Sequence, residues 1–162
     1  PLFAIGQLVD TILLPQAEVK ETRLRSDFSG TRSEQWSADE LSAYTTLADL
    51  LQQESGIFVK SYGLGSSATV ATRGGSAGHT AVLWNGLPIQ SPMLGLLDFS
   101  LMPTAFIDKA EVQYGGNSAA WGSGAIGGVI SLDNQVEKSK SFVALQTSVG
   151  SFGQFGLNLK TQ

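Results

Sequence analysis

The chain contains no cysteine, and histidine occurs only once, at position 79. The absence of cysteine excludes disulfide bonds and thiolate metal ligands. Because His79 has no second histidine or cysteine to act with, we expect it to be structural and predict no metal site. No pattern of serine, histidine and acidic residues indicates catalysis, so neither an enzyme nor a cofactor is expected.

Basic residues are also scarce. Ten lysines and arginines stand against 14 acidic residues, and the net charge is -4. Binding to a phosphate backbone depends on clustered Lys and Arg, so a nucleic-acid partner is not expected. Hydrophobic residues make up 42% of the chain, too many for a disordered protein. No run of about 18 apolar residues occurs, and no transmembrane helix is predicted.

Glycine, in contrast, is abundant, with 19 of 162 residues. The stretch AAWGSGAIGGVISL contains a G-x-G-x-x-G run at Gly122, Gly124 and Gly127. A nucleotide-binding loop needs a strand before this run and a helix after it. Here GGNSAAW precedes the run and the strand-like GGVISL follows it. The context therefore disfavours a nucleotide and favours close backbone packing or a bulge at Gly122, Gly124, Gly127 and Gly128.

The remaining pattern indicates short strands and one clear helix. The helix is predicted at 45–56, with Thr45 or Thr46 as its N-cap and Gly56 in a left-handed conformation at its end. Residues 26–40 are polar and predict a loop, and 87–103 predict a loop packed against something larger. Asn85–Gly86 is a strong hairpin-turn dipeptide. The predicted strands are 16–25, 57–62, 68–73, 80–84, 107–114 and 127–132.

The C-terminal segments 141–149 and 153–161 alternate strictly between apolar and polar residues around a short turn. Val143, Leu145 and Val149 share one face of the first strand, and Leu157 and Leu159 share one face of the second. Strands of this length and pattern are typical of outer-membrane barrels. An amphipathic hairpin on a soluble sheet would give the same pattern, so both interpretations stay open on these residues.

Five stretches taken together resemble the plug domain of TonB-dependent outer-membrane receptors. In chain order they are TLADLLQQESGIFV (46–59), ATRGG (71–75), HTAVLWNGLPIQ (79–90), FIDKAEVQYGGNSAAWGSGAIGGVISL (106–132) and VGSFGQFGLNL (149–159). The resemblance implies a β-rich α+β fold: a small mixed sheet of about four strands with short helices and long loops. It also implies that the C-terminal hairpin belongs to a 22-stranded barrel, which the plug fills.

Three segments follow from this resemblance. Residues 1–15 form an N-terminal extension, 16–135 the plug domain, and 136–162 the first strands of a barrel that this chain does not complete. The chain does not begin with Met. Its first residues could therefore be the remnant of a secretion signal or the boundary of a fragment.

In this family a short extended segment near the N-terminus pairs with a strand of TonB by β-augmentation. The stretch DTILLP has the matching apolar content and is the preferred candidate; its residues are Asp10, Thr11, Ile12, Leu13, Leu14 and Pro15. The stretch at 17–22 is the alternative, because it lies next to the plug. An ordinary linker strand is the remaining interpretation.

Arg73 matches the arginine of the family's Arg-Gly motif, which pairs with barrel carboxylates and locks the plug to the wall. A solvated arginine at a strand end is the alternative. A second family arginine is missing, since residues 114–116 read Tyr-Gly-Gly. The resemblance therefore implies a plug–wall contact that is weaker or rewired.

By analogy with the family, the loops at 61–67 and 87–98 face the ligand. Tyr62, Leu64, Gln90, Met93 and Leu94 offer the mixture of apolar and hydrogen-bonding groups that ligand sites use. Alternatively, these loops pack against the barrel wall.

The resemblance thus implies the gate of an active importer in the outer membrane, with the plug in the barrel lumen facing the periplasm. Its ligand would be a large scarce nutrient, such as vitamin B12 or an iron–siderophore chelate. The implied partners are TonB, the chain's own barrel, this small-molecule or metal-chelate ligand, and the membrane through the barrel. Two alternatives remain: a free-standing periplasmic or surface ligand-binding domain and, more distantly, a nucleotide-binding protein.

Overall fold

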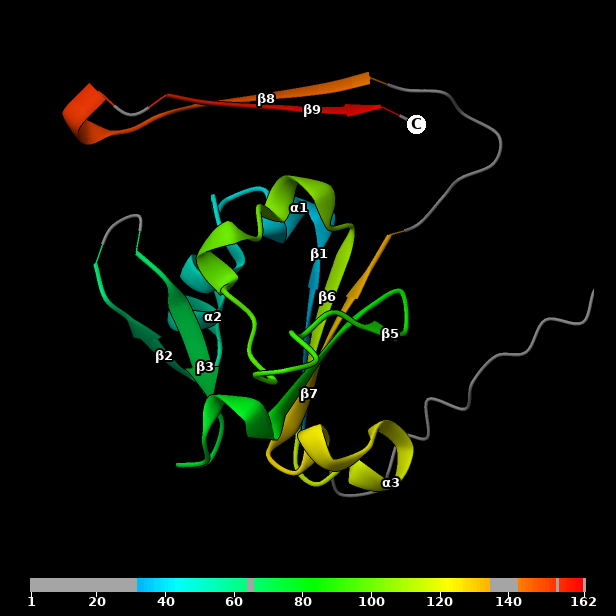
Figure 1. The fold of residues 1–162 in the computed structure, drawn as a ribbon. Helices are drawn as coiled ribbons and strands as arrows, with labels where there is room; N and C mark the ends of the chain where they lie inside the picture. The colour runs from blue at the N-terminus through cyan, green and yellow to red at the C-terminus, as the bar shows by residue number, and fades with distance from the viewer. Residues whose placement is uncertain (1–31, 64–65, 135–142, 154, 162) are drawn as a thin grey trace, which may run out of the picture.

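A computed structural model describes residues 32–63, 66–134, 143–153 and 155–161 (Figure 1). The predicted strand at 16–25, both TonB-binding candidates and Leu64 lie outside these residues. None of the described helices is long and apolar enough to cross a membrane.

Nine strands and three α-helices are described, with five short 3-10 turns between them. The strands are β1 (Ser33–Ser37), β2 (Phe58–Ser61), β3 (Ala68–Ala71), β4 (Thr80–Trp84), β5 (Leu87–Pro88), β6 (Lys109–Tyr114), β7 (Gly128–Asp133), β8 (Val143–Val149) and β9 (Phe155–Thr161). The helices are α1 (Ala38–Leu41), α2 (Leu47–Glu54) and α3 (Ser118–Trp121), and the 3-10 turns are η1 (Ala77–His79), η2 (Phe99–Leu101), η3 (Thr104–Phe106), η4 (Ser123–Ala125) and η5 (Ser151–Gly153).

A mixed five-stranded sheet in the order β1-β6-β7-β4-β5 forms the body of the protein. Strands β4 and β7 are parallel, and the other neighbouring pairs are antiparallel. The α+β, β-rich class predicted from the sequence is confirmed, with one strand more than expected. Strand β1 and most of α1 lie in the polar segment 26–40, which was predicted as a loop, and β5 lies in 87–103, which was also predicted as a loop. Only Trp36 of β1 is buried, so this edge strand has almost no apolar signal in the sequence.

Helix α2 begins where its cap predicts. The Thr46 side chain accepts a hydrogen bond from the Asp49 backbone N–H at 3.3 Å, and Asp49 accepts bonds from the Thr46 backbone and hydroxyl. These bonds satisfy N–H groups that the first turn of a helix leaves free. The prediction for Gly56 was wrong: the chain leaves the helix through extended Ser55, and Gly56 has no positive φ.

The main core lies between one face of the sheet and the layer of α2, β2 and β3 (Figure 1). Its largest fully buried side chains include Leu47, Leu50, Leu51, Ile130 and Phe99. Successive residues of a strand point to opposite faces, so β4 and β7 also supply a smaller cluster behind the sheet. That cluster contains Ala81, Leu83 and Val129 with Ala125 of η4. Both faces of the central strands are therefore covered.

Strand β4 turns into β5 at Asn85–Gly86, as the dipeptide predicts. Asn85 has φ 49° and Gly86 has φ 81°, the pair of positive values that a type I′ hairpin requires. This turn starts the long segment that carries Gln90, Met93 and Leu94.

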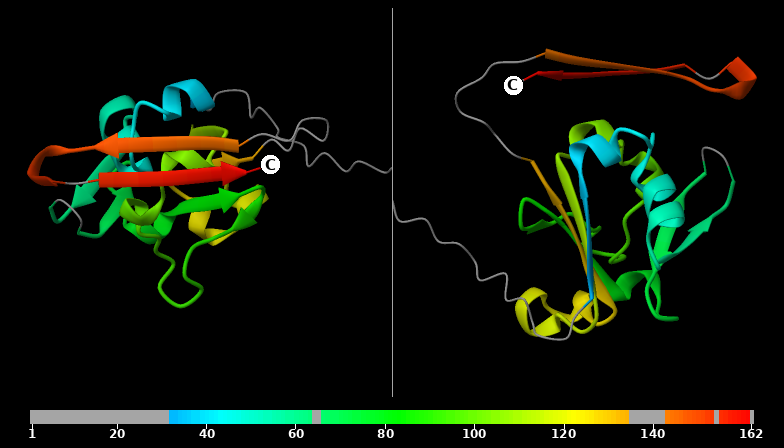
Figure 2. Two further views of the ribbon diagram at one scale, coloured as in Figure 1. Left: turned by 90° about the horizontal axis from the view of Figure 1, so that it is seen from above. Right: turned by 180° about the vertical axis from the view of Figure 1, so that it is seen from behind.

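Strands β8 and β9 form an antiparallel hairpin with seven residue pairs, from Val143↔Thr161 to Val149↔Phe155. The hairpin lies beside the body rather than in its sheet, and it crosses over the end that carries α1 and η3 (Figures 1 and 2). Two polar contacts join it to the body: Lys160 with Asp108, and Gln146 with the Ser42 carbonyl.

Candidate functional site

At the end of the glycine run, Gly127 and its neighbour Gly128 lie very close to atoms of other segments. A Cβ on Gly127 would lie 2.2 Å from the Thr72 hydroxyl oxygen and 3.1 Å from the His79 carbonyl oxygen. A Cβ on Gly128 would lie 2.7 Å from the Gln113 carbonyl oxygen on the neighbouring strand. Real Cβ atoms do not tolerate such distances, so these two positions require glycine for space.

The other two glycines of the run, Gly122 and Gly124, are not required for space. Gly122 has φ 83° with open space around its Cβ position, so it needs glycine for its backbone conformation. Gly124 would make only ordinary contacts, the nearest at 3.7 Å. Strand β7, not a helix, begins at Gly128. The helix N-terminus on which a nucleotide phosphate would sit is therefore missing after the run.

The parallel pairing of β4 with β7 brings two distant loops together. Thr80 is paired with Gly128, so the residues that precede each strand lie at the same end of the sheet. The Gly127 N–H donates a hydrogen bond to the His79 carbonyl at 2.8 Å. A hollow of about 610 Å³, the Gln90 groove, lies here. It is lined by Gly78, His79, Pro88, Gln90, Ser91, Pro92, Gly95, Ser123, Gly124 and Ile126.

The sequence predicted Gln90 on a ligand-facing loop but gave no sign of the two other walls of this groove, which are Gly78–His79 and the residues Ser123, Gly124 and Ile126. No local signal joins these segments, because their proximity follows from the parallel register alone. His79 lies on the rim of the groove and is exposed. Its Nδ1 accepts a hydrogen bond from the Ser76 backbone N–H at 3.3 Å, which closes the turn before β4.

The Gln90 side chain continues the pairing of β5 along the edge of β4. Its Oε1 accepts a hydrogen bond from the Val82 N–H at 3.2 Å. Its Nε2 donates to the carbonyl oxygens of Thr80 and Gly95, both at 2.8 Å. Both amide hydrogens are therefore used within the protein, and Gln90 holds the loop in place rather than offering a free donor to a ligand.

Beyond Gln90, the loop 91–96 closes on itself and presents an apolar tip. The Ser91 N–H donates to the Leu96 carbonyl at 2.9 Å, and the Gly95 N–H donates to the Ser91 carbonyl at 2.7 Å. Between these bonds, Met93 is 93% exposed and Leu94 is 69% exposed. These two adjacent apolar side chains form a small exposed patch at the tip of the loop.

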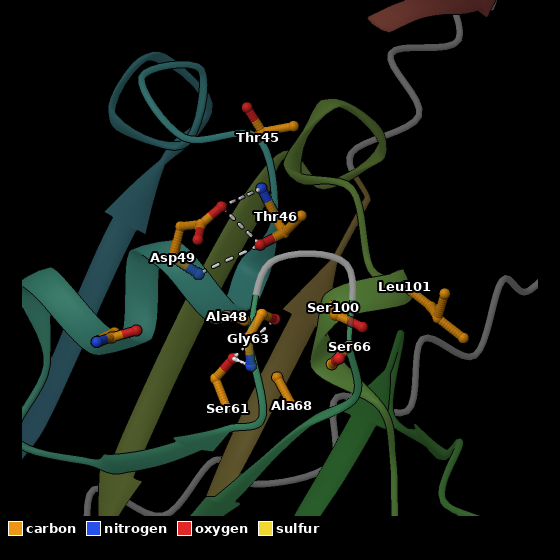
Figure 3. A pocket seen from close by; sticks show the side chains of 11 residues that line it. Thr45, Thr46, Ala48, Asp49, Ser61, Gly63, Ser66, Ala68, Ser100 and Leu101 are labelled. Carbon is orange, nitrogen blue, oxygen red and sulfur yellow. Dashed lines mark hydrogen bonds between the residues drawn. The ribbon is translucent and has the colours of Figure 1, made fainter. Parts of the chain in front are cut away.

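The second predicted ligand loop lines a separate hollow of about 600 Å³, the α2 hollow (Figure 3). Ser61, Gly63 and Ser66 face the start of α2 across it, and Thr45, Thr46 and Ser100 add hydroxyl groups. Tyr62 is exposed beside this hollow, with the Lys60 ammonium 5.0 Å from its ring centroid. Among the described residues, the two predicted loops therefore line two separate hollows.

Asp98 nevertheless ties the ends of these two loops together. Its Oδ1 accepts hydrogen bonds from the Ala68 N–H at 2.9 Å and from the Ser100 N–H and hydroxyl at 3.0 and 2.6 Å. The bond from the Ser100 hydroxyl, followed by that from the Ala68 backbone, lowers the pKa of Asp98 below its ordinary 3.8. The charged carboxylate thus fixes the start of β3 to the end of the 87–98 loop.

Arg73 lies in a tight turn directly after β3. Arg73 and Gly74 have φ 51° and 73°, and the Gly75 N–H donates to the Thr72 carbonyl at 2.9 Å. A left-handed conformation costs about 1 kcal/mol for a residue with a Cβ. The turn therefore holds Arg73 in a strained conformation and presents its side chain to solvent.

A glycine-packed sheet, a long loop with an apolar tip and a separate amphipathic hairpin define a plug-type receptor fold. The chain matches the TonB-dependent Receptor Plug Domain family over residues 29–129. It belongs to this family, as the resemblance predicted.

Known relatives agree with this assignment. The chain is 34% identical over 112 residues to the vitamin B12 transporter BtuB of Photobacterium profundum, covering 69% of this chain and 18% of the relative. It is 39% identical over 89 residues to the vitamin B12 transporter BtuB of Vibrio vulnificus strain YJ016, covering 54% and 14%. The chain thus spans less than a fifth of the length of these two relatives.

Among solved structures, the ferric yersiniabactin uptake receptor FyuA from Yersinia pestis has the same fold, with a TM-score of 0.66. The identity is 19%, and the match covers 82% of this chain and 21% of the receptor.

Proposed function

We propose that this chain is the gate of an active importer in the bacterial outer membrane. In this proposal, residues 16–135 fill the lumen of a β-barrel and 136–162 contribute the first strands of its wall. The family membership and the relatives' names support this role. The observation that carries it is the two-faced hairpin of β8 and β9.

The two faces of this hairpin differ sharply. On one face six apolar side chains are exposed, with no described element covering them: Val143, Leu145, Val149, Phe155, Leu157 and Leu159. The opposite face carries Gln146, Asn158 and Lys160, which are partly buried and include the side chains in contact with the body. An apolar face turned away from a polar, filled interior is the arrangement of a barrel strand in a membrane.

The Gln90 groove and the loop tip beside it are the ligand contact of this proposal. Met93 and Leu94 supply apolar contact at the tip, and Gln90 positions the loop that carries them. Tyr62 and Leu64 belong to the second contact loop. We infer a large nutrient chelate as the ligand and place vitamin B12 before iron–siderophores, because the relatives at 34% and 39% identity are named vitamin B12 transporters.

Two further contacts complete the proposal. Arg73 pairs with carboxylates of the barrel wall, which would explain why a strained turn presents it to solvent. Residues 10–15 bind TonB by adding a strand to it. Pulling on this segment would move the plug and open the lumen.

The test uses the full-length protein in outer membranes. Met93→Asp with Leu94→Asp should weaken cyanocobalamin binding at least tenfold, whereas Phe58→Asp, which changes an exposed apolar side chain of β2 outside the groove, should leave it close to wild type. Leu13→Pro should abolish energised uptake and leave binding intact, because proline cannot donate to a β-ladder. If the wild-type protein binds neither cyanocobalamin nor a ferric siderophore, the ligand assignment is wrong. Uptake that persists in cells without TonB would contradict the importer itself.

A further inference from the structure

One lysine stands out in the hairpin of β8 and β9. Among the described residues of this segment, 143–153 and 155–161, Lys160 is the only one with a charged side chain. That side chain is 21% exposed, and its ammonium forms an ion pair with the carboxylate of Asp108, which is 22% exposed. Lysine is rarely withdrawn from water unless it is paired, so this contact needs an explanation.

The strand register places Lys160 in a polar ladder that faces the body. Gln146 is paired with Asn158, one step along the same face from Ala144 and Lys160. The Asn158 amide donates to Gln146 at 3.5 Å, and the Gln146 amide donates to the Ser42 carbonyl at the same distance. These polar contacts join the hairpin to the body next to α1 and next to β6.

The charges of the two parts are complementary. Residues 32–134 carry nine carboxylates and only four lysines and arginines. Asp108 lies directly before β6, which is paired on both sides, with β1 and β7. Its backbone is held as well, since the Asp108 N–H donates to the Asp133 carbonyl at 3.1 Å. The cation of the hairpin therefore meets a carboxylate whose backbone is held at the start of an interior strand of the sheet.

We propose that the Asp108–Lys160 ion pair is a latch between plug and barrel wall, with the carboxylate on the plug and the cation on the wall. The charges are thus the reverse of those proposed for Arg73, where the cation lies on the plug and the carboxylates lie on the wall. The inference rests on the proposed function, because 143–161 must be part of the wall. The latch fixes the sheet of the plug to the first strands of its barrel, and opening the lumen requires it to break.

The first test is a cross-link in the full-length protein in outer membranes. Asp108→Cys with Lys160→Cys should react with a short bifunctional thiosulfonate at least tenfold more than Asp108→Cys with Leu159→Cys. Leu159 is the matched control because its side chain lies on the other face of β9. Equal reaction of both pairs would overturn the latch.

The second test reverses the charges. Asp108→Lys or Lys160→Asp alone should lower the inhibitory concentration of vancomycin, a large hydrophilic antibiotic, at least fourfold, because a loosened plug leaks. The double exchange should restore it, and Lys60→Asp on exposed β2 should not change it. A double exchange as leaky as either single variant would contradict the pairing. If the charge-reversal variants do not assemble in the membrane, Asp108→Asn replaces them, because asparagine has the shape of aspartate without its charge. Its sensitivity to vancomycin should lie between that of wild type and that expected for Asp108→Lys.

A third measurement separates the latch from the proposed function. Spin labels at 157, 158 and 159 should alternate in their accessibility to oxygen dissolved in lipid, with the labels at 157 and 159 the more accessible. Without this alternation the hairpin is not barrel wall, and both proposals fail. Alternation without the preferential cross-link removes the latch alone.

Discussion

Gly127 passes against Thr72 so closely that no side chain fits between them, and the Thr72 hydroxyl is itself 2.9 Å from the hydroxyl of Thr80. Both threonines are buried. The Thr72 hydroxyl therefore cannot move away from a new Cβ without leaving the Thr80 hydroxyl unpaired. This contact joins the Arg73 turn to the first residues of β4 and β7.

Gly127→Ala and Gly128→Ala should each lower the free energy of unfolding by about 3 kcal/mol, because both force atoms into occupied space. For Gly128 the obstacle is a backbone carbonyl, which cannot rotate away. Gly124→Ala is the control and should stay within about 0.5 kcal/mol of wild type. Urea unfolding of the chain measures all three. Equal losses at the three positions would show that the close contacts do not decide stability.

Gln90→Ala should release the 91–96 loop, because three hydrogen bonds to the backbone are lost at once. We expect the amide of Val82 to exchange with solvent at least tenfold faster. Gln90→Glu should keep part of this protection, since a carboxylate still accepts from Val82 but cannot donate to Thr80 or Gly95. Hydrogen exchange read by NMR checks both variants. If the Val82 amide of Gln90→Ala exchanges as slowly as in wild type, the Gln90 side chain is not what holds the loop in place.

Tyr114→Phe should cost about 1 kcal/mol, because the hydroxyl accepts a hydrogen bond from Gly56 and donates one to Glu34. Burial first, and then the bond to Glu34, raises the pKa of Tyr114 above its ordinary 10. A raised pKa gives stability that is complete below pH 10 and is lost as the pH rises through the folded value. The difference in free energy of unfolding between wild type and Tyr114→Phe should therefore become smaller at alkaline pH. Urea midpoints from pH 7 upwards measure it, with Tyr62→Phe as the exposed control.

Asp98 should make the protein less stable in acid, whereas Tyr114 makes it less stable in alkali. Its lowered pKa gives stability that is present above pH 3.8 and is lost as the pH falls towards the folded value. Asp98→Asn should be less stable than wild type at neutral pH. In strong acid the free energies of unfolding of the two proteins should become equal. Asp39→Asn, on exposed α1, provides the comparison. A difference between wild type and Asp98→Asn that stays constant from pH 6 to pH 2 would rule out the carboxylate as its source.

Arg73→Gly should leave the chain as stable as wild type or more stable by about 1 kcal/mol, because glycine adopts positive φ without strain. Arg73→Ala keeps the strain and removes the same guanidinium, so it should be less stable than the glycine variant by about that amount. Thermal unfolding of the two variants side by side gives this difference directly. If they unfold together, the turn is not strained.

The sequence alone determined the features that depend on neighbouring residues. Thr46 and Asp49 begin α2, Asn85–Gly86 turns β4 into β5, and the G-x-G-x-x-G run leads into a strand rather than a helix. These are local because a cap, a turn or an alternating strand needs only a few consecutive residues. The order of the motifs was also enough to identify the family.

Tertiary structure alone decided how distant segments meet. Strand β1 exists because it pairs with β6, although its residues favour a loop. The Gln90 groove exists because parallel pairing aligns Thr80 with Gly128. The side chain of Gln90 itself forms its hydrogen bonds with the backbone at the edge of β4. Asp108 and Lys160 are 52 residues apart, and only the packing of the hairpin against the body brings their charges together. Such contacts depend on register and packing over long separations, which no local pattern of residues encodes.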